Sequence, residues 1–466
     1  MNNVRISSKL VVKSDIFIGV FCEKIREHVM EAKHNGAIMI FADKESELIL
    51  GDAGRDVIFV DDARLLISRM AKFTHSLQPE CCVAITGTNG KSSIAHFVRQ
   101  LWNKLGKRAA NLGTLGLFIE NGTRIESESL GIPSLTTPDS FSLHRILEFL
   151  VDRNISHFAF EASSHALHQK RLHSVTLSAA AFSNLSSDHL DYHVTKAAYL
   201  EAKLLLFKEI LGQDNPAIIP SIPIDMMQRI QEFNRNIMTF GIEDAANISG
   251  TNIRCNYDRT IFDLSIDGES YRNIEVKLYG EFQIMNLICA IGLVYACGAS
   301  PGEIVNALPY ITGLSGRMEL ILDKNGKRVY IDYAHTSSAF EASLNALKKS
   351  CQNRLICVFG CGGDRDKSKR REMGEIAYEI SDIAIITDDN PRTEDPSVIR
   401  AEILRSCQKG IEIGDRKAAI RYTIDMMLPG DIVAIMGKGH ETNQIIMNGT
   451  IYHDDREEIL KCEEYL

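Results

Sequence analysis

The chain has 466 residues, a formal net charge of −9 and 45% hydrophobic residues. This length exceeds a single hydrophobic core and predicts two to four domains. The negative charge disfavours non-specific nucleic-acid binding, and the sequence contains no run of about 20 apolar residues that would span a membrane. The 11 cysteines are scattered, odd in number and without a CxxC pair, so we expect reduced thiols in a cytoplasmic protein.

The first segment, residues 1–80, has the pattern of a small α/β unit. Apolar runs predict strands, and helical spacing predicts helices. The strands are Ile16–Phe21, Ala37–Phe41 and Val57–Val60, and the helices are Val29–His34 and Ala63–Thr74. No cluster of catalytic residue types occurs here, so this segment alone indicates only a fold class.

Residues 81–312 form the second expected unit, which opens with a glycine loop. An apolar strand runs into the loop Thr86–Ser93, and helical spacing of apolar residues follows from Ile94 to Leu105. Strand, glycine loop, Lys, hydroxyl and helix together are typical of a phosphate-binding loop.

The chemistry of this loop suits a nucleotide. Gly87 and Gly90 let backbone N–H groups close around phosphate oxygens. Lys91 can neutralise the β- and γ-phosphates, and the Ser92 hydroxyl can ligate Mg²⁺. The standard pattern has a glycine where Ile85 stands, so the loop is a variant. An ordinary strand-to-helix turn is the alternative, which Gly-Lys-Ser and both flanking elements disfavour.

Two later strands of this unit end in residues that can bind a metal ion. The strand from Phe158 carries Glu161 near its C-terminal end, where open α/β sheets bind ligands. The strand Ala179–Ser183 leads into a loop with four such residues, Asp188, His189, Asp191 and His193. Mg²⁺ beside phosphates favours carboxylates and accepts imidazole. A solvated glutamate and a polar turn are the alternatives.

Three other features complete this unit. Pro138 is placed to begin a helix over Ser140–Asp152. A second helix is expected over Lys196–Leu211, and its apolar face leaves Lys203 to one side, as for a solvated residue. The segment Phe240–Tyr279 alternates like a small antiparallel sheet.

Residues 313–466 form a third α/β unit. Four apolar strands alternate with helices, and each ends in Gly, Asp, His or Arg: Val329–His335, Leu355–Phe359, Ile383–Thr387 and Ile432–Met436. This pattern predicts a doubly wound sheet with one binding edge.

Six motifs occur along the chain in one order. They are Thr86–Ser93, Glu161–His165, Asp188–His193 after Asn184-Leu185, Asp332–Thr336, Gly360–Arg365 and Asp389–Arg392. With them the chain resembles the Mur ligase family over residues 5–460, and within it the members that add meso-diaminopimelate to UDP-N-acetylmuramoyl-L-alanyl-D-glutamate. The resemblance implies three domains: a UDP-muramoyl-binding domain (1–80), a central P-loop ATPase domain (81–312) and a C-terminal, Rossmann-like amino-acid domain (313–466).

The resemblance also implies site residues. ATP contacts are implied for Gly87, Thr88, Asn89, Gly90, Lys91, Ser92, Ser93, Asn286, Arg317 and Asp332. Catalytic roles are implied for Lys91, Glu161, His189 and Lys203. Mg²⁺ ligands are implied at Ser92, Glu161, His189 and Lys203, the last after CO₂ has carbamylated its amine to N6-carboxylysine. UDP-muramoyl dipeptide contacts are implied for Ser8, Thr136, Thr137, Ser163, Gln169 and Arg171. Diaminopimelate contacts are implied for Arg365, Asp389, Asn390, Pro391, Arg392, Gly437 and Glu441.

Three positions depart from the family pattern. Ser92 stands where Thr is usual, and Gln283 stands where Asn is common. The N-terminal Asp-Ser-Arg reads Ser7-Ser8-Lys9 here. Arginine can form a bidentate hydrogen bond to a phosphate, whereas lysine acts as a point charge.

The expected reaction is ATP-dependent amide formation through an acyl phosphate, in cytoplasmic peptidoglycan precursor synthesis. Arg392 could bind the second carboxylate of diaminopimelate, which L-lysine lacks. Either His189 or His193 could take the amine proton. We expect a monomer that binds neither nucleic acid nor membrane.

Three alternatives remain. A relative could add L-lysine or a glutamyl tail on folate, which the Asp389–Arg392 motif disfavours. A nucleotide-binding protein without chemistry is disfavoured because Lys91, Glu161, His189 and Lys203 are all present. A phosphate-loop kinase would release a stable phosphorylated product.

Overall fold

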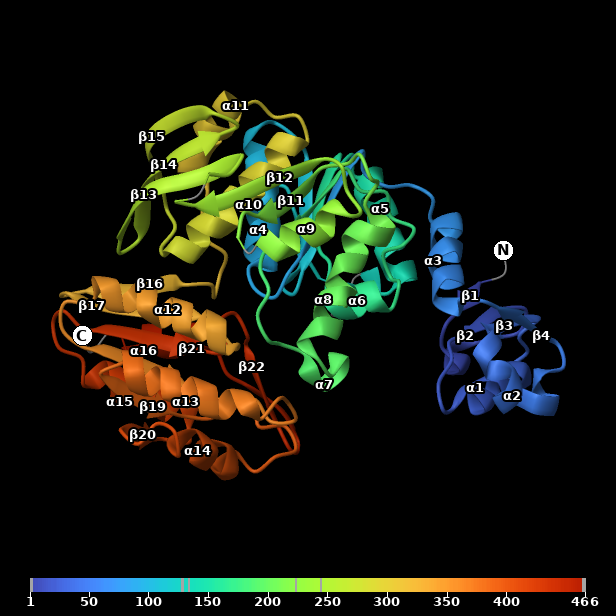
Figure 1. Ribbon diagram of the computed structural model, residues 1–466. Coiled ribbons are helices and arrows are strands. Elements are labelled where there is room, and N and C mark those ends of the chain that lie inside the picture. Colours follow the sequence, from blue (N-terminus) through green and yellow to red (C-terminus); the bar gives the residue numbers. More distant parts are fainter. Residues whose placement is uncertain (1–2, 127–129, 133–134, 223, 244, 463–466) are drawn as a thin grey trace.

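The computed structural model describes residues 3–126, 130–132, 135–222, 224–243 and 245–462. The chain forms three α/β units around separate sheets, and Figure 1 shows the N-terminal unit apart from the other two. The α/β prediction is therefore confirmed. Within the described ranges, no helix has the length and apolar character needed to cross a lipid bilayer.

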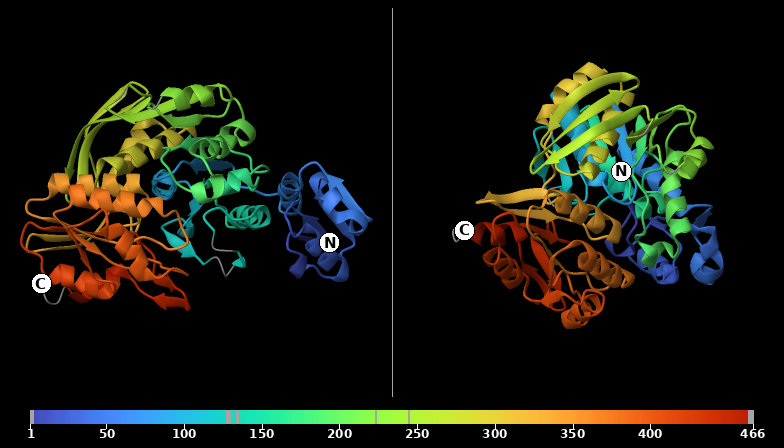
Figure 2. Two further views of the ribbon diagram at one scale, coloured as in Figure 1. Left: turned by 60° about the horizontal axis from the view of Figure 1, so that its bottom comes forward. Right: turned by 60° about the vertical axis from the view of Figure 1, so that its left-hand side comes forward.

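The N-terminal unit is a parallel four-stranded sheet in the order β1-β2-β3-β4. Its elements are β1 (Val4–Arg5), β2 (Ile16–Gly19), α1 (Ile25–His34), β3 (Met39–Asp43), α2 (Glu47–Leu50), β4 (Val57–Val60) and α3 (Ala63–Thr74). Asp62 caps α3 by accepting a hydrogen bond from the Leu65 amide at 2.8 Å. Because α3 packs against α5 (Ser140–Asp152), it joins this unit to the middle one, and Figure 2 shows the N-terminal unit (blue) at the edge of the molecule.

The middle unit is one 11-stranded sheet in the order β15-β14-β13-β12-β11-β10-β5-β9-β6-β7-β8. Its strands are β5 (Cys81–Thr86), β6 (Ala109–Gly113), β7 (Gly116–Ile119), β8 (Thr123–Ile125), β9 (His157–Glu161), β10 (Ala179–Phe182), β11 (Ala217–Pro220), β12 (Ile237–Ile242), β13 (Ile248–Asn256), β14 (Arg259–Ile266) and β15 (Glu269–Val276). Its remaining helices are α4 (Lys91–Lys104), α6 (Ser164–His168), α7 (Leu190–His193), α8 (Lys196–Leu205), α9 (Ile224–Gln231), α10 (Glu281–Ala296) and α11 (Pro301–Ala307). Helices α4 and α10 bury one face of this sheet, while α5 and α8 bury the other.

Three expectations for this unit are corrected. Strands β13–β15 pair antiparallel as expected, but they extend the main sheet, because β13 pairs in parallel with β12 through Phe240 and Ile248. Helix α8 ends at Leu205 and continues as a π-helical turn, Leu206–Ile210, closed by the Leu211 amide donating to the Leu206 carbonyl. Pro138 lies before the N-cap residue of α5, which is Asp139.

The C-terminal unit is a six-stranded sheet in the order β16-β17-β21-β18-β19-β20, with one antiparallel pair, β16 with β17. Its strands are β16 (Glu319–Lys324), β17 (Lys327–Asp332), β18 (Leu355–Phe359), β19 (Ile383–Ile386), β20 (Gly410–Glu412) and β21 (Ile432–Met436), with a separate hairpin of β22 (Asn443–Ile446) and β23 (Gly449–Tyr452). Its helices are α12 (Ser337–Ser350), α13 (Ser368–Ile380), α14 (Pro396–Leu404), α15 (Arg416–Asp425) and α16 (Asp455–Cys462). Helices α12–α14 cover one face and α15 and α16 the other, so the predicted doubly wound sheet is confirmed.

A buried ion pair ties α15 to α16. Arg416 donates from Nε and Nη2 to the two carboxylate oxygens of Asp455, each at 2.7 Å, and both side chains have no exposed surface. His453 Nε2 lies 2.7 Å from the same carboxylate. Burial acts to raise the pKa of Asp455, but Arg416 and His453 outweigh it and hold the pKa below its ordinary value. The pair therefore stabilises the fold only where Asp455 is ionised.

Replacing Asp455 by alanine should lower the free energy of unfolding by about 3–5 kcal/mol, because Arg416 would stay buried without a counter-charge. The exposed Asp425→Ala on the same helix pair should change it by less than about 0.5 kcal/mol. The difference in unfolding free energy between the two variants should reach its full size above pH 4, about the pKa of an unfolded aspartate, and should shrink as the pH falls below that value. Urea unfolding measured across pH checks this, and equal midpoints for both variants would contradict it.

Candidate active site

The phosphate loop lies between β5 and α4 and depends on two glycines with positive φ, Gly87 at 136° and Gly90 at 87°. A Cβ on Gly87 would lie 2.0 Å from Ser183 Oγ, and one on Gly90 would lie 2.2 Å from Asn286 Oδ1. Both side-chain contacts leave no room for a larger residue. The loop is thus closed against the end of β10 on one side and α10 on the other.

The segment after β10 fixes the loop backbone. Asn184 accepts hydrogen bonds from the Thr88 and Asn89 amides, at its backbone oxygen and its Oδ1 respectively, each at 2.9 Å. Ser183 Oγ donates to the Asn89 carbonyl at 2.6 Å. The Asn184-Leu185 motif therefore holds the glycine loop in shape, and the sequence alone did not predict this role.

Two lysines converge on one backbone oxygen of the loop. Lys91 Nζ donates to the Gly87 carbonyl at 2.9 Å, and Lys203 Nζ donates to the same oxygen at 2.6 Å. Lys203 is only 1% exposed, so its expected solvated position is wrong; the fold of α8 against the loop buries it. Burial and then the nearby Lys91 charge lower the pKa of Lys203 well below its ordinary value. The Lys203 amine therefore loses its proton more readily than an ordinary lysine.

Glu161 ends β9 and faces the start of α4. Its Oε1 accepts hydrogen bonds from Ser92 Oγ at 2.7 Å and from the Thr114 amide at 2.8 Å, and the residue is 2% exposed. A Cβ on Gly113 would lie 1.8 Å from this oxygen, so the glycine leaves space for the carboxylate. Two of the expected Mg²⁺ ligands, Ser92 and Glu161, are thus in direct contact.

His189 lies on the loop before α7. Its Nε2 is 3.5 Å from Asp188 Oδ2, and its ring centroid is 4.9 Å from that of His165. Desolvation, partly opposed by Asp188, lowers the pKa of His189 to about 4, although the side chain is 46% exposed. The imidazole is therefore neutral at pH 7, as a metal ligand must be.

The donor atoms present suit Mg²⁺ only in part. In the described ranges, no three His, Cys, Asp or Glu side chains form a group that could hold a metal ion. Ser92 and Glu161 offer the oxygen ligands that Mg²⁺ prefers, and His189 offers a neutral nitrogen. A further carboxylate at Lys203 would complete this set.

Four of the six expected dipeptide residues form one network beside Glu161. Arg171 donates to the Thr137 carbonyl at 2.7 Å and to Gln169 Oε1 at 2.6 Å. Thr137 Oγ1 accepts from the Ser163 amide at 3.1 Å and donates to the Glu161 carbonyl at 2.7 Å. The network therefore reaches the strand end that carries the Glu161 carboxylate.

The other two residues of this set lie at different places. Thr136 Oγ1 is 3.2 Å from Thr114 Oγ1, next to the network. Ser8 belongs to the N-terminal unit, is 4% exposed, and donates to Glu31 Oε2 at 2.6 Å. The structure therefore brings Thr136 to the dipeptide network and does not bring Ser8 there.

The expected nucleotide contacts from the C-terminal side lie at the junction of two units. Asp332 accepts from the Met318 and Ala334 amides at 2.6 and 2.7 Å. Burial, opposed by Arg317, raises the pKa of Asp332 to about 6. The Arg317 guanidinium lies 4.3 Å over the ring centroid of Tyr333. Arg317 and Asp332 thus share one corner at the end of β17.

A second link connects this corner to the phosphate loop. Gln283 Nε2 donates to the Arg317 carbonyl at 3.2 Å. Asn286 Nδ2 donates to Gln283 Oε1 at 3.4 Å, and Asn286 borders Gly90. Gln283, the unusual residue, is therefore the bridge between the two parts of the expected ATP site.

The expected amino-acid residues cluster at the ends of β19 and β21. Asn390 Nδ2 donates to Glu441 Oε2 at 2.9 Å. Lys438 donates to Glu441 Oε2 at 2.8 Å and to Asn390 Oδ1 at 3.1 Å, and its side chain has no exposed surface. A Cβ on Gly437 would lie 2.8 Å from Asp389 Oδ2. Lys438 was missed as a site residue; its place between two glycines after a buried strand was the available signal.

Two guanidinium groups lie together at this cluster. Arg392 donates from Nη1 to the Gly363 carbonyl at 2.8 Å. Burial and then the positive charge of Arg365 lower the pKa of Arg392. A half-buried Arg392 next to an exposed Arg365 favours an anionic ligand.

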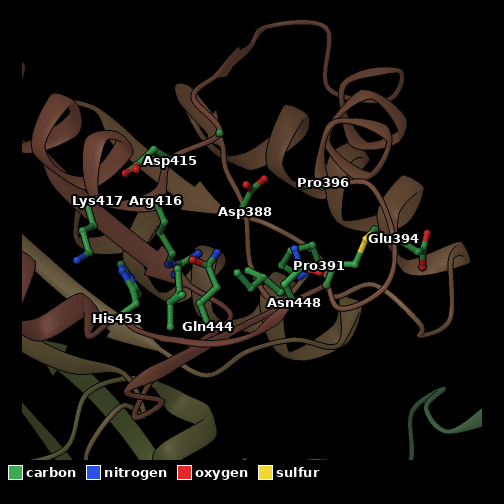
Figure 3. A pocket seen from close by; sticks show the side chains of 14 residues that line it. Asp388, Pro391, Glu394, Pro396, Asp415, Arg416, Lys417, Gln444, Asn448 and His453 are labelled. Carbon is green, nitrogen blue, oxygen red and sulfur yellow. The ribbon is translucent and has the colours of Figure 1, made fainter.

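A cavity of about 450 Å³ lies behind the Asp389–Arg392 loop, and Figure 3 shows it between the start of α15 and the β22–β23 hairpin. Pro391 is the one expected amino-acid residue that lines it. Gln444, also in its wall, donates to the Asp389 carbonyl at 2.6 Å. The cavity thus adjoins the amino-acid cluster from the hairpin side.

Side chains of the C-terminal unit reach the middle unit at the phosphate loop. Thr336 Oγ1 donates to Asn89 Oδ1, and Asn89 Nδ2 donates to Ser338 Oγ, both at 3.3 Å. Lys369 Nζ donates to Asp188 Oδ1 at 2.7 Å. The C-terminal unit is therefore in contact with the phosphate loop and with the loop that carries His189.

Comparison with known proteins agrees with this arrangement. The family model described as Mur ligase middle domain matches residues 85–294, and the model described as Mur ligase, glutamate ligase domain matches residues 316–439. The UDP-N-acetylmuramoyl-L-alanyl-D-glutamate–2,6-diaminopimelate ligase of Brucella melitensis is 40% identical over 456 residues, covering 94% of this chain and 89% of the relative. The protein of that name from Rhizobium meliloti is 37% identical over 468 residues, covering 99% and 94%.

A solved structure agrees as well. It is a UDP-N-acetylmuramoyl-L-alanyl-D-glutamate–2,6-diaminopimelate ligase, 31% identical in sequence, and it superposes with a TM-score of 0.70. The match covers 100% of this chain and 95% of that one. Sequence and fold agree over nearly the whole length, and the chain belongs to the Mur ligase family.

Proposed function

We propose that this chain is the ATP-dependent ligase that joins meso-diaminopimelate to UDP-N-acetylmuramoyl-L-alanyl-D-glutamate, the reaction for which its relatives are named. The observation that carries the proposal is the contact between the phosphate loop and the unit bearing the Asp389–Arg392 motif. A phosphorylated carboxylate formed at the first can meet an amine held at the second. The product serves cytoplasmic peptidoglycan precursor synthesis.

The first step activates the D-glutamyl carboxylate, a poor electrophile when ionised. Its oxygen attacks the γ-phosphorus of ATP, the bond to the β-phosphate oxygen breaks, and ADP leaves. Lys91 lies at the loop carbonyls of Gly87 and Thr88, where its charge can stabilise the transferring phosphoryl group. Ser92, Glu161, His189 and carbamylated Lys203 would hold Mg²⁺, which neutralises phosphate charge when bound.

Carbamylation of Lys203 follows from its position. A neutral amine attacks CO₂, a C–N bond forms, and one proton leaves to give a carboxylate. The lowered pKa supplies that neutral amine, and the contact with the Gly87 carbonyl keeps it beside the loop. The modification replaces a cation, which would repel Mg²⁺, with a hard oxygen ligand.

The second step forms the amide. The diaminopimelate amine attacks the acyl carbon, the bond to the phosphate oxygen breaks, and the amine proton passes to a base. His189 and His193 are the two candidate bases, since each imidazole is neutral at pH 7. A pKa of about 4 makes each a weak base, and His189 can take the proton only when it is not bound to Mg²⁺. Arg392, with Arg365 beside it, would bind the distal carboxylate of the amino acid.

Domain closure would keep water from the acyl phosphate. We propose the limits 1–80, 81–312 and 313–466 for the UDP-muramoyl, ATPase and amino-acid domains, with Ser8 at the UDP end. We also propose that the protein is a cytoplasmic monomer. The domain limits, the location and the monomeric state follow from the family resemblance.

Incubation with ATP, Mg²⁺, the UDP-muramoyl dipeptide and either meso-diaminopimelate or L-lysine tests the function by product mass. We expect the diaminopimelate product and little L-lysine product, because Arg392 would stay desolvated and unpaired with lysine. Equal turnover of both amino acids would remove the diaminopimelate assignment, and ATP consumption without an amide product would remove the ligase.

Replacing Arg392 by alanine should raise the KM for diaminopimelate about 10- to 100-fold, since a charge-assisted bond is worth roughly 1.5–3 kcal/mol. The KM for ATP should stay within about twofold, because the phosphate loop is in another unit. Arg405→Ala, at an exposed site in the same unit, serves as the control. An unchanged KM for diaminopimelate would contradict the role of Arg392.

Lys203→Ala should lower kcat on the order of 100-fold by removing a charged ligand beside the phosphates. Added acetate or formate should restore part of the activity by entering the vacated space as a carboxylate. Mass measurement of the native wild-type protein in bicarbonate should show one added CO₂, absent in the variant. Full activity of Lys203→Ala would contradict the proposal.

A further inference from the structure

One ion pair joins the C-terminal unit to the loop that carries His189. Lys369, in the first turn of α13, donates to Asp188 Oδ1 at 2.7 Å. The two side chains are 17% and 8% exposed. A pair this far from solvent is costly to break, because one charge would stay desolvated.

The pair acts directly on the His189 backbone. Asp188 Oδ1 accepts a hydrogen bond from the Lys369 ammonium and another from the His189 amide, the latter at 2.9 Å. His189 has φ of 53°, a left-handed conformation that needs local support. The side chain that supports it is thus held from the opposite unit.

The residue after Lys369 points to the amino-acid cluster. Arg370 is 1% exposed and forms ion pairs with Glu394 and Glu402, each at 2.8 Å. Glu394 lies two residues after Arg392, and its Oε1 also accepts the Asp364 amide at 2.7 Å. The first turn of α13 therefore connects the loop that holds the amine with the loop that holds His189.

We propose that Lys369 is a positioning residue that fastens the closed arrangement of the two units during amide formation. The inference rests on the proposed function and adds a residue that none of the six motif roles includes. Lys369 fixes the distance between the amino-acid cluster and the acyl phosphate and keeps water out of the gap. The neutral contacts of Asn89 with Thr336 and Ser338, at 3.3 Å, are longer and weaker.

The test compares Lys369→Ala and Lys369→Arg with Lys349→Ala. Lys349 pairs with Glu281 across the same two units at 2.8 Å, but that pair is 67% and 53% exposed. It is therefore a matched control for an inter-unit ion pair away from the phosphate loop. Each variant is assayed as full-length protein for kcat, the KM of ATP and the molar ratio of ADP released to amide formed.

Lys369→Ala should lower kcat about 10- to 100-fold, leave the KM of ATP within about twofold, and raise the ADP-to-amide ratio above one as water reaches the acyl phosphate. Lys369→Arg should recover most of the coupling, and Lys349→Ala should match the wild type. A merely structural role would lower the amount of active protein without changing the ratio.

Wild-type kcat and a ratio of one in Lys369→Ala would overturn the proposal, as would an equal loss in Lys349→Ala. A wild-type enzyme that forms no amide would instead defeat the proposed function. The two failures are therefore distinguishable.

Discussion

The carbonyl oxygen of Gly87 accepts hydrogen bonds from the buried Lys203 and the half-buried Lys91, and the rest of the site depends on this arrangement. Two ammonium groups so close repel each other, and burial lowers the pKa of both. Negatively charged groups can reduce this repulsion in two ways. Phosphate oxygens can bind at Lys91, and a carboxyl group can form on Lys203. The local excess of positive charge therefore favours anionic groups, such as phosphates, at this loop.

The sequence predicted those features that short segments determine. The phosphate loop was predictable because strand, glycines, Lys91 and helix are contiguous. Glu161 was predictable because its strand is apolar and ends at the sheet edge where ligands bind. Four of the strands in the C-terminal unit, β17, β18, β19 and β21, were predictable for the same reason. In each case the local pattern and the tertiary structure agree.

Features that depend on contacts between distant segments were not predictable. Helical spacing put Lys203 beside the apolar face of α8, but the phosphate loop packs against this side chain and helps to bury it. The alternation over Phe240–Tyr279 predicts antiparallel strands, but it does not show that β13 pairs in parallel with β12. Lys438 and Lys369 carry no motif of their own. The first gains its role from Asn390 and Glu441, and the second from Asp188 in another unit.

The β22–β23 hairpin has a consequence for how this enzyme can diversify. The Ile445 carbonyl accepts a hydrogen bond from the Arg392 amide at 3.1 Å. The Ile445 amide donates a hydrogen bond to Asn390 Oδ1 at 2.9 Å. Backbone atoms of the hairpin, a segment outside every motif, therefore hold the Asp389–Arg392 loop in its conformation. Natural variation or an insertion in this hairpin can tilt the loop while its signature letters stay intact. Under the amino-acid-binding role proposed for Arg392, two family members with identical signatures can thus prefer different amines.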